Sequence, residues 1–178
     1  MFFDPMYLMF MLPGFILALG AQNKVKGAYA KYSKVPNMAG ISGAQAARRI
    51  LDQQGLQSVP VESTKGVLSD HYDPRSRKLV LSDDVYNGRT VAAVAIAAHE
   101  AGHALQHQEG YAPLKARTAI VPAVSIGSNL GFIVLIVGVM IGNLMLGWVG
   151  VALFGLATLF ALITLPVEFN ASSRAKLA

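Results

Sequence analysis

The hydrophobic positions of this chain are concentrated in three long apolar segments, which are residues 5–21, 123–141 and 144–167. Between Arg117 and Glu168, 50 consecutive residues contain no aspartate, glutamate, lysine or arginine. A soluble domain of this size needs no such run, whereas two membrane crossings of about 20 residues each do. We therefore expect an N-terminal transmembrane anchor in residues 1–21 and a transmembrane helical hairpin in residues 119–167.

The more polar region between these segments, residues 22–118, has the patterns of shorter helices and a small β-hairpin. Residues 42–54 have the apolar spacing of an amphipathic helix, and two extended runs around Asp73-Pro74 predict a hairpin. A second helix is expected at about residues 90–108. The expected fold class is therefore mainly α with a small β-hairpin (α+β), together with about three transmembrane helices.

The charged residues add an orientation to this picture. Residues 22–118 hold 13 of the 15 lysines and arginines, with a cluster from Lys24 to Lys34 directly after the first apolar segment. Cytoplasmic flanks of membrane helices are enriched in these residues, so we expect residues 22–118 and the C-terminus in the cytoplasm and the N-terminus outside, in a plasma membrane of the bacterial type. A signal peptide cleaved near Gly20 is the alternative for the first segment, but no positive charge precedes its apolar core. The net charge of +5 fits this topology, and no nucleic-acid-binding pattern is present.

A candidate metal site lies in the helix expected at about residues 90–108. His99, Glu100 and His103 form an HExxH pattern. Residues four apart lie on one face of a helix, so the two histidines can bind one ion together, while Glu100 can accept a proton from an attacking water. The chain has no cysteine, so any metal must be held by histidine and carboxylate side chains. The uninterrupted apolar part of this helix, residues 91–98, is too short to cross a bilayer, which argues against a protease whose HExxH lies inside a spanning helix.

A catalytic zinc site needs three protein ligands and one open position. His107 continues the same helical face, but it lies roughly 12 Å from His99 along the helix axis, too far to share an ion. Glu168 is the first charged residue after the hairpin, and two crossings return it to the side of the membrane that holds residues 22–118. It is the candidate third ligand of one Zn²⁺, at the start of a cytoplasmic helix in residues 168–178. The alternative is a carboxylate that only anchors the end of a membrane helix.

Three stretches carry a resemblance to a known family, and they are Asp70–Pro74, Ala97–Gln106 and Leu165–Ser172. They resemble the membrane-bound neutral zinc metallopeptidases of the YugP-like family, and the resemblance covers nearly the whole chain. It implies a zincin-like catalytic region in which His99, His103 and Glu168 bind zinc and Glu100 is the catalytic base. The order of elements is also similar to that of the HtpX and prenyl-protein protease group, which has a ligand-supporting aspartate where this chain has Ser172.

The sequence thus predicts a membrane-anchored zinc endopeptidase that hydrolyses peptide bonds in peptide or protein substrates, with Glu100 as the general base. His71, Tyr72 and Arg174 are the candidates for stabilising the oxyanion. The main alternative is a zinc-binding membrane scaffold or a truncated, inactive pseudo-peptidase, because the chain ends at Ala178, earlier than such families usually do after the third ligand. A metal transporter is disfavoured, since no charged residue or histidine lies within the spanning segments. The lipid bilayer is the other expected partner, and the sequence is compatible with an oligomer.

Overall fold

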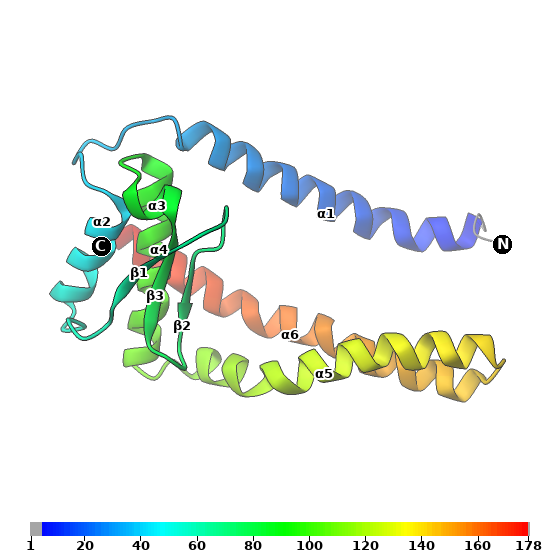
Figure 1. Cartoon of the computed structure of the whole chain (residues 1–178). Coiled ribbons are helices and arrows are strands. Elements are labelled where there is room, and N and C mark those ends of the chain that lie inside the picture. Colours follow the sequence, from blue (N-terminus) through cyan, green and yellow to red (C-terminus); the bar gives the residue numbers. More distant parts are fainter. Residues whose placement is uncertain (1–4, 178) are drawn as a thin grey trace.

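Helices dominate the computed structural model, which describes residues 5–177 (Figure 1). Residues 1–4 of the predicted anchor and residue 178 of the predicted C-terminal segment lie outside the described residues. In chain order the elements are α1 (Pro5–Tyr32), α2 (Gly43–Gln53), β1 (Val61–Thr64), β2 (His71–Asp73), β3 (Lys78–Ser82), α3 (Asp83–Asn87), α4 (Val91–Gln108), α5 (Ala112–Met140) and α6 (Leu144–Leu177). The expected class, mainly α with a small β component, is confirmed.

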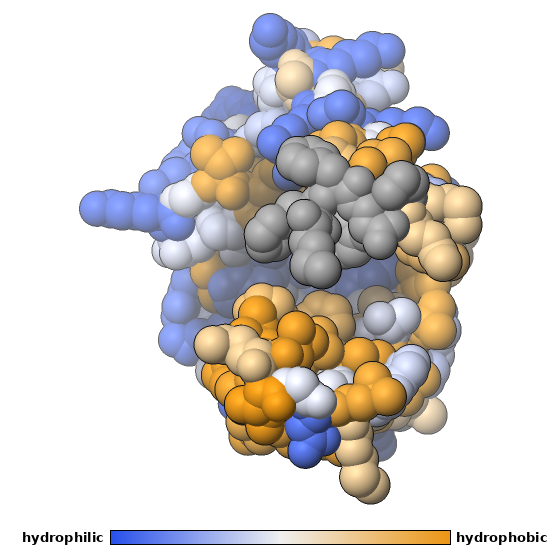
Figure 2. Space-filling view, turned by 90° about the vertical axis from the view of Figure 1, so that its right-hand side faces the viewer, coloured by the Kyte–Doolittle hydropathy of each residue, from blue (hydrophilic) through white to orange (hydrophobic). Residues whose placement is uncertain are grey.

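Three of the described helices are long and apolar enough to cross a membrane, in the segments Leu8–Tyr32, Ala112–Met140 and Leu144–Leu177. Figure 1 shows α1 and the α5–α6 pair running from the rest of the molecule toward the same end, where the N-terminus and the hairpin turn lie. Seen from that end, the tip of the hairpin is largely apolar (Figure 2), with Ile141, Leu144 and Met145 exposed. An exposed apolar surface of this extent is typical of a region that a bilayer surrounds.

The predicted boundaries at residues 118 and 168 are not helix boundaries. α5 already begins at Ala112, and α6 continues through Glu168 to Leu177, so Glu168 lies in the last third of a long helix and not at the start of a new one. The charge pattern predicts where the chain leaves the apolar layer, whereas the backbone hydrogen bonds of a helix can continue across such a point. Both helices therefore extend from the apolar region to the site without a break.

Close packing of α5 against α6 depends on glycines that face the partner helix. A Cβ added at Gly131 would lie 2.6 Å from the backbone nitrogen of Phe154, and one at Gly138 would lie 2.5 Å from that of Gly147. Small residues allow membrane helices to approach this closely. The turn between the helices contains Gly142 with a φ of +67°, a conformation that residues with a side chain rarely adopt.

The core lies between α2, α4 and the sheet. Its buried members are Ala47, Ile50, Leu51, Val59, Leu79, Leu81, Val85, Ala93, Ala97, Ala98, Ala101, Ala104 and Leu105. α4 also meets α6 closely at Gly102, where an added Cβ would lie 2.8 Å from the carbonyl oxygen of Ala171. Ala171 is three residues after Glu168, less than one helical turn away, so this crossing brings Glu168 next to the histidines of α4.

The sheet has the strand order β1-β3-β2. β2 and β3 form the predicted antiparallel hairpin, and β1 adds a parallel strand that the sequence pattern did not predict. Residues opposite each other in an antiparallel pair either exchange both backbone hydrogen bonds or exchange none. The N–H of Leu79 donates to the carbonyl of Pro60 on the β1 side, so Leu79 exchanges none with Tyr72, the residue opposite it. The N–H and C=O of Tyr72 therefore point away from β3. β2 is thus an edge strand, and its unpaired side borders α4.

Candidate metal centre

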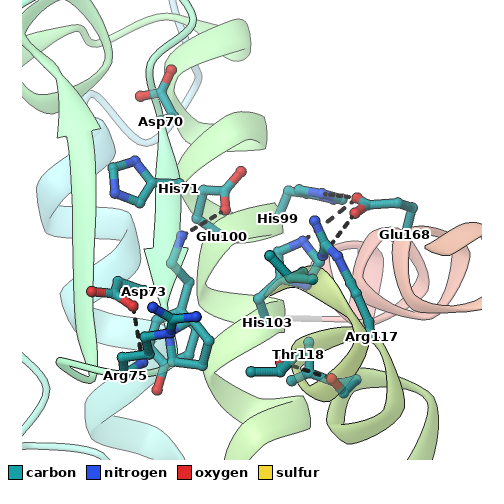
Figure 3. Close-up of a pocket in the computed structure, with 14 residues that line it drawn as sticks. Asp70, His71, Asp73, Arg75, His99, Glu100, His103, Arg117, Thr118 and Glu168 are labelled. Atoms are coloured by element: carbon teal, nitrogen blue, oxygen red, sulfur yellow. Dashed lines mark hydrogen bonds and ion pairs between the residues drawn. The ribbon is translucent and has the colours of Figure 1, made fainter. Parts of the chain in front are cut away.

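The two histidines of the HExxH pattern lie on one face of α4, and Glu168 of α6 lies opposite them (Figure 3). Glu168 Oε2 is 3.2 Å from His99 Nε2 and 3.5 Å from His103 Nε2. Around a tetrahedral zinc ion with bonds of about 2.1 Å, two ligand atoms are about 3.4 Å apart. One ligand atom from each of the three residues lies within 4.8 Å of the others. The structure therefore brings the three predicted ligands together, and the two distances from Glu168 Oε2 are close to those expected around one zinc ion.

Gln106 holds the second ring nitrogen of His103. Its side chain is fully buried, and Oε1 lies 3.0 Å from His103 Nδ1. Its Nε2 donates to the carbonyl of Val167 and to Asn170 Oδ1, which fixes the amide oxygen as the atom facing the ring. His103 Nδ1 therefore carries the proton, and Nε2 is the nitrogen left for a metal. Burial alone would lower the pKa of His103, but hydrogen bonds with Glu168 and Gln106 outweigh it, and the net pKa is raised.

Ser172 contacts Nδ1 of His99, as Gln106 contacts Nδ1 of His103. Its hydroxyl oxygen lies 3.2 Å from His99 Nδ1, on the opposite side of the ring from the nitrogen that faces Glu168. The side chain stands at the position where the HtpX-like group has a ligand-supporting aspartate, and here a hydroxyl makes the contact to the histidine. Both histidines thus have Nδ1 in contact with a polar side chain, as is usual for metal-binding histidines.

Arg117 is a site residue that the sequence analysis missed. It comes from α5, and its Nη1 lies 3.2 Å from Glu168 Oε1, the carboxylate oxygen that does not contact the histidines. A signal for it was present in the sequence. Arg117 is the last charged residue before the 50-residue uncharged run and Glu168 is the first after it, and a helical hairpin brings the two ends of such a run together.

Glu100 lies beside the three predicted ligands and points toward β2 (Figure 3). Its Oε2 accepts a hydrogen bond of 3.1 Å from the backbone N–H of Tyr72. Burial raises the pKa of the Glu100 carboxyl, although the neighbouring His103 and His99 and the bond from Tyr72 oppose the rise. A carboxylate with a raised pKa is a better proton acceptor near neutral pH than an ordinary one.

His107 does not join the ligands, in agreement with the distance argument. Tyr72 Oη lies 2.8 Å from His107 Nδ1, and the two rings meet edge to face with centroids 5.8 Å apart. Burial, together with the positive charges of Arg77 and Lys115, lowers the pKa of His107. Burial also raises the pKa of Tyr72, so both groups are uncharged near neutral pH. This neutral pair connects the edge strand β2 to α4.

A cavity of about 610 Å³ lies between β2, α4 and α5, and its lining includes His99, Glu100, His103, Arg117 and Glu168. His71 and Tyr72 contribute to its β2 wall, and Leu114, Thr118 and Val121 contribute to its α5 wall. Two of the three oxyanion candidates, His71 and Tyr72, are therefore at the cavity.

Arg174, the third oxyanion candidate, lies outside this cavity. Its guanidinium forms two hydrogen bonds of 2.6 and 2.7 Å with the carboxylate of Glu109 at the end of α4, and its Nε donates to Asn170. The prediction failed because residues 168 and 174 lie six positions apart on a helix, on different faces. Arg174 connects α6 to α4, whereas Arg75 and Arg117 are the arginines that line the cavity.

A His–His–Glu cluster with a half-buried glutamate beside it is typical of zinc peptidases. Here it lies where the apolar hairpin of α5 and α6 meets the small α+β unit formed by α2, α3, α4 and the sheet. The sequence profile of the family described as "Putative neutral zinc metallopeptidase" matches residues 7–178, and the chain belongs to this family. The "Putative membrane protease YugP" of Bacillus subtilis (strain 168) is 52% identical over 160 residues, which cover 90% of this chain and 71% of the relative. No solved structure matches the chain.

Proposed function

We propose that this protein is a membrane-anchored zinc endopeptidase, with His99, His103 and Glu168 as the zinc ligands and Glu100 as the general base. The observation that carries the proposal is the convergence of three possible ligand atoms within 4.8 Å of one another, next to the half-buried Glu100, in one cavity. The family of the chain and its membrane-protease relative support the same class of activity.

The residues present fit zinc by their chemistry as well as by their spacing. Two imidazoles and one carboxylate are a known ligand set of catalytic zinc, and they leave a fourth position free. When bound, zinc would lower the pKa of a coordinated water to about 7 and polarise the scissile carbonyl. Glu100 would accept the proton of the attacking water and then deliver it to the leaving amine, for which its raised pKa is suited.

The substrate is proposed to be a peptide segment in extended conformation. β2 is an edge strand beside Glu100, and the backbone of Tyr72 points away from β3 toward this side. A peptide that pairs with such an edge is held by its main chain, which allows cleavage of varied sequences. The Tyr72–His107 pair supports this role, because it fixes the strand relative to the helix that carries the histidines.

The orientation proposed from the sequence is that the cavity and the C-terminus face the cytoplasm. The lysine cluster at Lys24 to Lys34 supports it, because it lies at the end of α1 next to the small α+β unit. α1 and the hairpin extend from that unit toward the same end of the molecule (Figure 1), which is compatible with an N-terminus outside.

A zinc-binding scaffold is the competing function, and one experiment separates the two. The full-length protein in nanodiscs is assayed for bound zinc and for hydrolysis of an unfolded protein, as wild type and as Glu100→Gln. We expect the variant to retain zinc and to lose hydrolysis. Full hydrolysis by Glu100→Gln would remove Glu100 from the mechanism, whereas zinc binding without any hydrolysis by the wild type would favour the scaffold.

A further inference from the structure

Glu168 divides its two carboxylate oxygens between different partners. Oε2 lies 3.2 and 3.5 Å from the Nε2 atoms of His99 and His103, whereas Oε1 lies 3.2 Å from Arg117 Nη1. The guanidinium reaches the carboxylate from α5, so three helices meet at this one side chain (Figure 3). One oxygen faces the metal ligands, and the other faces a cation.

We propose that Arg117 is a positioning residue of the metal centre, which holds Oε1 and thereby restricts Glu168 to binding zinc through Oε2 alone. This inference rests on the proposed zinc site. A carboxylate with both oxygens free can bind a metal ion through both, and the second bond occupies space that a water or a substrate carbonyl needs. With Oε1 engaged by the guanidinium, the His–His–Glu set keeps its fourth position open.

The exposure of the pair separates this role from a purely structural one. The side chains of Arg117 and Glu168 are 31% and 38% exposed, so the ion pair is only partly shielded from solvent. Ion pairs of this exposure contribute little to folding. A structural role therefore predicts small effects of Arg117 substitutions on both stability and zinc affinity. The positioning role predicts a small effect on stability with a large effect on zinc affinity and coordination.

The substitutions that test the proposal differ in what they keep of the guanidinium. Arg117→Met keeps the length of the side chain but removes its charge and its hydrogen-bond donors. Arg117→Lys keeps the charge without the planar arrangement of donors. Lys115→Met is the matched control, because Lys115 is an exposed cation on the same helix and does not line the cavity.

Two readouts are measured on the full chain in nanodiscs: zinc affinity by chelator competition, and the visible absorption spectrum of the Co²⁺-substituted protein. Four-coordinate Co²⁺ absorbs visible light more strongly than five-coordinate Co²⁺, so the spectrum reports whether Glu168 binds through one oxygen or two. For Arg117→Met we expect a loss of zinc affinity of about 10–100-fold, as for other residues that orient metal ligands, and a weaker spectrum. Arg117→Lys should be intermediate in both, and Lys115→Met should match the wild type.

Wild-type zinc affinity and an unchanged Co²⁺ spectrum in Arg117→Met would overturn the proposal. An equal loss in Lys115→Met would also overturn it, because the effect would then be one of net charge. Thermal unfolding shows whether each variant is folded. If Arg117→Met does not fold, the zinc affinity and the Co²⁺ spectrum of Arg117→Lys test the proposal instead. A wild-type protein that binds no zinc would instead refute the zinc site itself, so the two failures are distinguishable.

Discussion

Replacement of Gln106 by methionine should weaken both the fold and the metal centre. The side chain is fully buried and makes three hydrogen bonds, to His103, Val167 and Asn170. The acceptors on Val167 and Asn170 keep other partners, the helix backbone and Arg174, so each lost bond costs about 1 kcal/mol or less. The N–H of His103 is left buried without a partner, which costs about 1–3 kcal/mol. We therefore expect the free energy of unfolding to fall by about 2–4 kcal/mol.

The assay compares thermal and denaturant unfolding of metal-free Gln106→Met with that of the wild type, and zinc affinity is measured by chelator competition. Zinc affinity should fall by about 10–100-fold, because the ring of His103 is no longer held with Nε2 toward the metal. Gln108→Met is the control, since Gln108 lies on the same helix but is exposed and makes one hydrogen bond to the carbonyl of Gln54. That control should change stability by about 0.5 kcal/mol or less. A Gln106→Met protein that equals it in stability and zinc affinity would refute the reasoning.

Three further predictions concern neighbouring positions. Glu168→Ala should lose stoichiometric zinc in metal analysis, and a full zinc content would exclude Glu168 as a ligand. Gly102→Ala should destabilise the fold by about 1–3 kcal/mol in thermal unfolding, because the new methyl group meets the carbonyl oxygen of Ala171 at 2.8 Å, and an unchanged unfolding temperature would show that the crossing can relax. The hydrogen bond from Arg174 lowers the pKa of Glu109, so the pair stabilises the fold above the ordinary carboxyl pKa, and this contribution is lost as the pH falls through the lowered value. Glu109→Gln should therefore flatten the pH dependence of stability on the acid side, and an unchanged profile would mean that the pair adds nothing.

The meeting of His99, His103 and Glu168 could be predicted from the sequence because its determinants are periodicity and topology. The spacing of His99 and His103 places them on one face of any helix, and the helix was predicted from its own apolar pattern. The location of Glu168 was predicted from the number of spanning segments, because two crossings return the chain to the side from which it started. Neither inference requires knowledge of how one helix is rotated about its axis relative to another. For the same reason the hairpin of β2 and β3 was predictable. The pairing of β1, which has no buried residue to give a pattern, with a distant strand was not.

The residues that support the ligands depend on how α6 is rotated against α4, which the sequence pattern does not specify. The close crossing at Gly102 and Ala171 fixes that rotation, and it places Ser172 against His99. The same rotation directs Arg174 to the end of α4 instead of into the cavity. The charge pattern did not predict the ends of the helices, because helical hydrogen bonding does not stop where the surroundings change from lipid to water.

The position of Glu168 along α6 leads to a prediction about substrates that rests on the proposed function. A crossing of about 20 residues that begins at Leu144 would end near Ile163, and Glu168 lies five residues further, roughly 7 Å along the axis. The polar headgroup layer on each side of the hydrocarbon is about 5–8 Å thick, so the metal centre would lie within reach of that layer. A peptide linked by a short flexible segment to a transmembrane helix should then have an effective concentration in the millimolar range at the cavity. We expect cleavage of such a peptide in proteoliposomes to be about 100-fold more efficient than that of the same peptide free in solution. Equal kcat/KM values for the two would place the cavity away from the membrane surface and contradict the depth inferred from α6.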